Sequence, residues 1–189
     1  MTPATPRHLT HLTHATHPVN SAALLVDAFG RIREVVRDAV EGLTEDELAA
    51  RIDPDANSVA WLVWHLTRIQ DDHLADAFDT EQLWASDGWA ARFALPFSRR
   101  ATGYGQTSAQ VGEVRASAEL LLGYHDAVHA RTVELIGSVT NADLGRIVDT
   151  AWDPPVTLGV RLVSVIADDL QHAGQAAFVR GVVERRGTS

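Results

Sequence analysis

The sequence contains no cysteine. A chain without thiols forms neither a disulfide framework nor a cysteine-ligated zinc site. Any metal ion must therefore be held by histidine, aspartate or glutamate, and a catalytic thiol from the chain itself is excluded.

Basic charge is scarce, and long apolar runs are absent. The chain has 16 basic residues, all of them arginine, against 25 acidic ones, which gives a formal net charge of −9. Nucleic-acid binding rests on a concentrated basic face, which is missing here. No apolar run approaches the roughly 20 residues that span a bilayer, and the N-terminus lacks the apolar segment of a signal peptide. We expect a cytoplasmic protein with no nucleic-acid partner and no membrane contact.

Length and hydrophobic content predict one domain. The chain has 189 residues, of which 46% are hydrophobic, and this is enough to bury a core without cross-links. Residues 1–19 are expected to form a flexible arm whose histidines bind metal only adventitiously. These histidines are His8, His11, His14 and His17. Residues 20–189 are predicted to form the domain.

The helical spacing of apolar residues predicts an all-α fold. Four long helices are expected at about 21–42, 59–78, 107–138 and 157–185. A capping box at Thr44 and Glu47 predicts a short helical turn after the first of them. No stretch has a strand pattern. The long connection 79–107 is rich in aromatic residues, so we expect it to cover one end of a four-helix bundle.

Two polar residues interrupt the apolar stripe of the last predicted helix. Asp168 and His172 are four residues apart, which places their side chains on one face, and Gln175 lies on the same stripe. A carboxylate buried beside an imidazole needs a partner, because uncompensated burial of polar groups is unfavourable.

His65 is a similar interruption in the second predicted helix. It lies within the most apolar stretch of the chain, and Asp72 follows two turns later on the same face, where it can orient a ligand or a substrate. His65, Asp168 and His172 together would place two imidazoles and one carboxylate around one divalent ion, with coordination positions left open. Such a set suits Zn, Ni, Fe, Mn or Co and does not choose among them.

Other interpretations of these residues stay open. A buried His65 also fits a hydrogen-bonded core residue, and Asp168 with Asp169 also fits a solvated turn. A second pair of histidines, His125 and His129, lacks the Glu-x-x-His units of a di-metal site. We expect that pair at a surface or an interface.

Several segments of the chain resemble a known family. They are residues 57–66 (NSVAWLVWHL), 83–89 (LWASDGW), 92–96 (RFALP), 168–175 (DDLQHAGQ) and the pair Arg180-Gly181. The first and the last two resemble the DinB-like metalloprotein superfamily, and the middle ones are similar to its actinobacterial branch of mycothiol transferases. The likeness covers about residues 20 to 185.

The resemblance implies a DinB-like four-helix bundle, a homodimer and one divalent metal ion. His65 matches the family's ligand on the second helix, and His172 matches the last ligand on the final helix. Asp168 stands where histidine or glutamate is more usual. The branch further implies S-transfer from a mycothiol-like, low-molecular-weight thiol cosubstrate, which fits the absence of cysteine.

In this interpretation the metal activates the thiol for attack on a small-molecule electrophile. The electrophile is expected under the aromatic segment, which includes Trp84 and Trp89. Asp72 and Gln175 are expected to support the ligands or the substrate.

Two arginines are further candidates for contact with the thiol. Arg180 or Arg161 is expected to meet a carboxylate of the thiol, or else to form an ion pair at a helix end.

Two other functions remain open. A metal-dependent hydrolase of the same fold fits these residues too, as does a non-catalytic, stress-related binding or dimerisation module.

Overall fold

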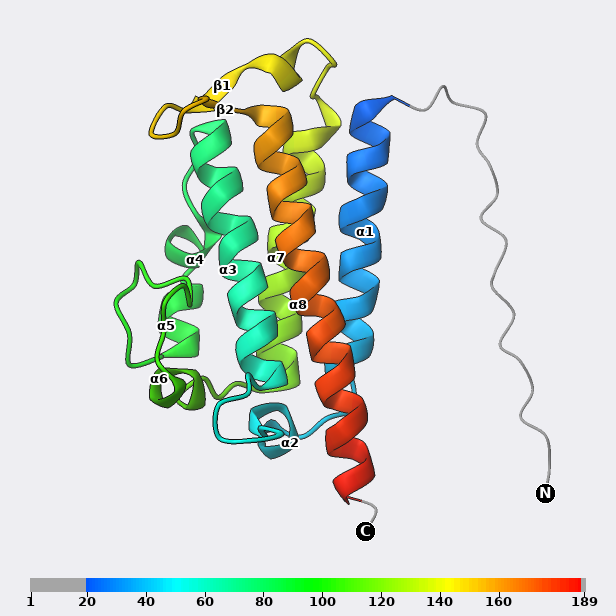
Figure 1. Ribbon diagram of the computed structural model, residues 1–189, viewed down its shortest axis with the longest axis vertical. Helices are drawn as coiled ribbons and strands as arrows, with labels where there is room; N and C mark the ends of the chain where they lie inside the picture. The colour runs from blue at the N-terminus through cyan, green and yellow to red at the C-terminus, as the bar shows by residue number, and fades with distance from the viewer. Residues whose placement is uncertain (1–19, 188–189) are drawn as a thin grey trace, which may run out of the picture.

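Four long helices lie side by side in the computed structural model, which describes residues 20–187 (Figure 1). They are α1 (Ser21–Val40), α3 (Val59–Phe78), α7 (Ala118–Gly137) and α8 (Leu158–Gly187). Helix α3 packs against α8 and α7, and α1 packs against the same two helices from the other side. The predicted arm, residues 1–19, lies outside the described residues.

Short elements connect the long helices. They are α2 (Glu45–Ala49), α4 (Leu83–Ser86), α5 (Trp89–Phe93), α6 (Ser108–Gly112), the 3-10 turn η1 (Asp143–Gly145) and the strands β1 (Ile147–Asp149) and β2 (Val156–Thr157). The two strands pair antiparallel, with Ile147 opposite Thr157. The mostly helical architecture is therefore as predicted, apart from this small sheet. Strands of three and two residues are too short to show an alternating pattern of apolar and polar residues, so no strand was predicted here.

Capping residues set where the helices begin. Asn20 accepts from the Ala23 amide at 2.8 Å at the start of α1, and Ser58 accepts from the Trp61 amide at 3.1 Å at the start of α3. These bonds satisfy amides that have no partner within a first helical turn. The helices predicted at about 21–42 and 59–78 are confirmed, with the first ending at Val40, as is the capping box that opens α2.

The single helix predicted over 107–138 is wrong. Helix α6 ends at Gly112, and α7 begins only at Ala118, after an intervening segment. Ser117 explains the new start, because its side chain accepts from the Leu120 amide at 3.2 Å and caps α7. The apolar pattern continued across the break because Val114 and Ala116 are buried in the core without being helical.

His125 lies in the core, which contradicts its expected place at a surface or interface. Its side chain is 1% exposed, and its Nδ1 lies 3.1 Å from the Thr67 hydroxyl of α3. That hydroxyl donates its proton to the Val63 carbonyl, so the His125 Nδ1–H donates to Thr67. The buried face of α7 is wider than its apolar residues suggest, because polar side chains on this face form hydrogen bonds with side chains of α3.

Acidification is expected to destabilise the protein through His125. Burial, with repulsion from His129 as a smaller cause, lowers the pKa of His125 from 6.5 to about 3. Between these values the unfolded chain binds a proton that the folded chain does not, so stability falls as the pH decreases through this window. The contribution is at most about 1.4 kcal/mol per pH unit. Urea unfolding of the wild type and of His125→Gln, each at pH 7 and at pH 5, measures how much stability each protein loses between the two pH values. The variant should lose less stability, and parallel losses would refute the assignment.

Within residues 20–187, no helix has the length and apolarity needed to cross a membrane.

Candidate metal centre

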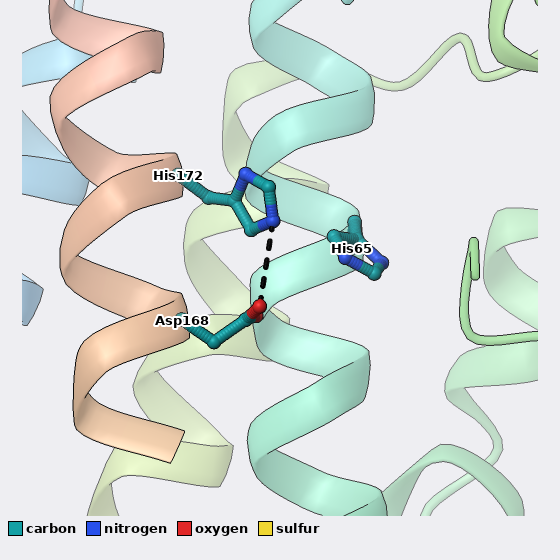
Figure 2. Close-up of side chains that lie close together, drawn as sticks. All are labelled: His65, Asp168 and His172. Carbon is teal, nitrogen blue, oxygen red and sulfur yellow. Dashed lines mark ion pairs between the residues drawn. The ribbon is translucent and has the colours of Figure 1, made fainter. Parts of the chain in front are cut away.

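Helices α3 and α8 bring three predicted ligands together. His65 comes from α3, and the side chains of Asp168 and His172 extend toward it from α8 (Figure 2). One ligand atom from each residue lies within 4.8 Å of the other two. No second group of three such residues assembles elsewhere in the described part of the chain, so His125 and His129 stay outside any such cluster.

The ring of His65 is held by a hydrogen bond at one edge and by an aromatic ring on one face. Its Nδ1–H donates to the Thr102 carbonyl at 2.5 Å, which leaves Nε2 available to a metal. One ring face stacks on Trp61 with 4.6 Å between centroids and 18° between planes. Trp61 is itself fixed, because its Nε1–H donates to Gln106 at 2.7 Å. The orientation and tautomer of His65 are therefore set by contacts outside the cluster.

His172 is oriented in a similar way. Its Nδ1 lies 3.0 Å from the Gln175 side-chain oxygen, so the Nδ1–H donates there and Nε2 faces Asp168. Nε2 lies 3.6 Å from one oxygen of Asp168, and the ring meets that of His65 edge-on with 4.8 Å between centroids. Gln175 thus contacts a member of the cluster, on the side away from the other members.

The donor set fits a divalent cation. The other Asp168 oxygen, Oδ2, is buried without a hydrogen-bond partner among the described residues, which is unfavourable unless a cation satisfies it. Tetrahedral ligands about 2.1 Å from a zinc ion lie roughly 3.4 Å apart, so side-chain movements of about 1 Å each would bring these three atoms onto one ion. Two imidazole nitrogens and one carboxylate oxygen also leave positions open for a substrate.

Burial keeps His65 in the form that binds metal. Desolvation lowers its pKa below 6.5, the hydrogen bond to Thr102 opposes this, and the charges of His172 and Asp168 act in opposite directions. The imidazole is therefore neutral at pH 7, and a metal ion has no proton to displace from it.

Gly103 allows the chain to approach His65 closely. Its φ is +100°, a conformation that favours glycine. A Cβ at this position would lie 2.6 Å from His65 Nδ1 and 3.2 Å from Trp61. Sequence reasoning missed Trp61, Thr102 and Gly103 as parts of the site. Only Trp61 gave a signal, since it lies one turn before His65 on the same helix.

Gly103→Ala is expected to weaken metal binding about 10- to 100-fold, as for other changes that displace a partner of a ligand. The added Cβ pushes the His65 ring out of its bond to Thr102. Gly105→Ala is the matched control, because φ there is also positive, at +71°, but nothing lies within 4 Å of the added Cβ. Titration of metal-free protein with Zn²⁺ measures both. Equal losses in the two variants would assign the effect to backbone strain.

Asp72 and Arg180 make their hydrogen bonds to residues outside the cluster. The Asp72 carboxylate accepts from Gln82 at 2.6 Å, further along α3. The Arg180 guanidinium donates to the carbonyls of Asp38 and Glu41, which ties α8 to the end of α1. The same guanidinium forms an ion pair with Glu184, with 2.9 Å between nitrogen and oxygen.

Trp84 and Trp89 are not brought to the cluster either. They are 4% and 7% exposed and pack against Tyr124 with ring centroids 5.3 and 5.4 Å away. The physical reason is the anchoring of α4 on α3, where Asp71 accepts from the amides of Leu83 and Trp84. These aromatic rings therefore turn inward as core.

The fold and the site define a mostly helical protein with a cluster of two histidines and one aspartate between two long helices. The family model described as mycothiol-S-transferase matches residues 24–185, and the chain therefore belongs to this family, within the DinB-like superfamily. Among solved structures, the crystal structure of the conserved protein of locus from Enterococcus faecalis is similar. It is 30% identical with a TM-score of 0.82, and the match covers 88% of this chain and 98% of that one. A comparison with curated proteins finds no match.

Proposed function

We propose that the protein is a divalent-metal-dependent S-transferase that joins a mycothiol-like, low-molecular-weight thiol to small electrophiles. The observation that carries the proposal is the convergence of His65, Asp168 and His172 in a cysteine-free member of the mycothiol-S-transferase family. We assign the four long helices to the DinB-like bundle and these three side chains to the metal. A cytoplasmic homodimer is part of the same proposal.

A bound divalent ion supplies a Lewis acid that lowers the pKa of a thiol and so favours its reactive thiolate form. The residues of the chain would hold the ion and orient its ligands. The Nε2 atoms of His65 and His172 would hold the ion together with the Asp168 carboxylate, while Thr102 and Gln175 accept from the opposite nitrogens and fix both tautomers.

The reaction itself is a substitution or addition at carbon. The thiol releases its proton to water, and its sulfur forms a bond to the electrophilic carbon. The displaced electron pair departs with the leaving group, or it shifts onto the electrophile, which then takes up a proton. The chain supplies no sulfur, because it has no cysteine. Trp61, stacked on His65, covers one side of the cluster and limits access of water from there.

A conjugation assay with mycothiol and monobromobimane tests the function. Zinc-loaded full-length protein is expected to accelerate formation of the conjugate, and His65→Ala should lower the rate by more than about 100-fold, beyond the loss typical of outer contacts. Reactions without enzyme give the background rate. Consumption of an electrophilic ester without any thiol would support a hydrolase instead. Absence of turnover in both assays would leave the binding-module alternative.

A further inference from the structure

A polar cleft lies along the same two helices, α3 and α8, that carry the metal cluster. It has a volume of about 1040 Å³ and lies along the second half of α3, where the start of α8, the connection between β1 and β2, and the segment before Thr102 border it. Its lining includes Asp72, Asp76, Arg99, Asp149, Trp152 and Arg161. We call it the α3 cleft.

The α3 cleft and the cluster share the groove between two helices. Helices α3 and α8 are antiparallel (Figure 1), and the cleft residues Asp72 and Arg161 are each seven residues from a cluster member, toward the same end. Seven residues of helix correspond to about 10 Å. The cleft is electrostatically linked to the cluster too. Burial lowers the pKa of His73, which lines the cleft, and Asp168 is among the carboxylates that oppose this effect.

The walls of the α3 cleft are shaped by fixed polar contacts. Arg161 donates to the Asp149 carboxylate at 2.6 Å, and its second nitrogen donates to His73 at 3.3 Å. Gln82 donates to Asp72 at 2.6 Å. These bonds join α3, α8 and β1, so the cleft has its shape before any ligand enters.

The lining favours one class of ligand. The carboxylates of the lining accept hydrogen bonds, its arginines donate them, and its only large aromatic ring is that of Trp152, which is 67% exposed. An apolar electrophile gains little against such walls, and a polyanion is repelled by Asp72, Asp76 and Asp149. A neutral, hydroxyl-rich ligand both donates to carboxylates and accepts from arginines, and the C–H face of a sugar ring can stack on an indole.

We propose that the α3 cleft binds the sugar-like, polyhydroxylated portion of the thiol cosubstrate and so directs its sulfur toward the metal cluster. This inference rests on the proposed function. It adds a thiol-specificity site that contains none of the three metal ligands. A cysteine arm reaches roughly 5 Å beyond the sugar ring, and a metal–sulfur bond adds about 2.3 Å, so a sugar bound at the near end of the cleft brings its sulfur to the cluster. Thiols without a sugar then reach the cluster without using the cleft.

Kinetics with two thiols test the inference. Mycothiol carries its cysteine on a sugar–inositol body, and N-acetylcysteine has no sugar. With monobromobimane as electrophile, Trp152→Ala and Asp76→Ala should raise the KM for mycothiol about tenfold and leave kcat and the KM for N-acetylcysteine unchanged. Phe178→Ala is the matched control for Trp152, because its ring is 63% exposed on α8 outside the cleft lining, and it should change neither KM. Equal changes for both thiols, or none, overturn the proposal.

Direct binding separates failure of this inference from failure of the proposed function. Titration calorimetry of full-length protein with glucosaminyl-inositol, the sulfur-free body of mycothiol, requires no catalysis. Binding to the wild type that weakens in Trp152→Ala and persists in Phe178→Ala supports the cleft, even where no conjugation is detected. No heat of binding with the wild type overturns the cleft, even where the conjugation assay succeeds.

Discussion

Replacing His172 with alanine is expected to remove about one bound divalent ion per chain, because an ion left with one imidazole and one carboxylate from different helices lacks the three protein ligands of a stable site. His172 contributes Nε2 next to Asp168, and its other nitrogen is already bonded to Gln175. Elemental analysis of full-length protein, produced without a polyhistidine tag, measures the loss. A second measurement follows from linkage: Zn²⁺ should raise the unfolding temperature of the wild type and leave that of the variant nearly unchanged.

His129→Ala is the matched control for this measurement. His129 is also half-buried on a long helix, but it is not part of the cluster. Both variants keep the N-terminal histidines, so any metal bound there cancels in the comparison. Equal metal contents in the wild type, His172→Ala and His129→Ala would contradict the assignment of the cluster.

Local patterns were sufficient to nominate the members of the cluster. The spacing of four between Asp168 and His172 fixes a shared helix face, and a histidine within the apolar run of α3 has to be buried. The bounds of α3 were equally predictable, because Ser58 caps its start and apolar residues continue to Phe78. What links α3 to α8 is a contact between segments about 100 residues apart, which no local spacing encodes.

The parts that were missed depend on such long-range contacts. Nothing near Gly103 in the sequence shows that His65 lies against it, since the contact exists only once the connection folds over α3. Trp84 and Trp89 looked like a substrate cover because aromatic residues in a long connection suit either role. Their burial was decided by Asp71, a residue on a different element.

Asp71→Ala is expected to lower the free energy of unfolding by about 3–5 kcal/mol, since it leaves a buried arginine charge without its partner. Asp71 is 5% exposed and lies 3.4 Å from the guanidinium of Arg68, which is fully buried. The same carboxylate accepts from the Tyr124 hydroxyl at 2.8 Å and from two amides at the start of α4. Urea unfolding followed by circular dichroism measures the loss. Native domains have only about 5–15 kcal/mol of stability, so the variant would lie near the limit of folding.

Glu134→Ala is the matched control, because Arg131 and Glu134 form a pair with the same spacing of three residues on the exposed side of α7. Removing an exposed partner should cost below about 1 kcal/mol, and a similar loss in both variants would refute the role of burial. The consequence of Asp71→Ala extends to the metal centre. Arg68 also donates to the Ala101 carbonyl at 3.3 Å, and the next residue, Thr102, holds the ring of His65. Releasing Arg68 loosens this connection, so folded Asp71→Ala protein should bind Zn²⁺ more weakly than Glu134→Ala, although neither residue lies in the cluster.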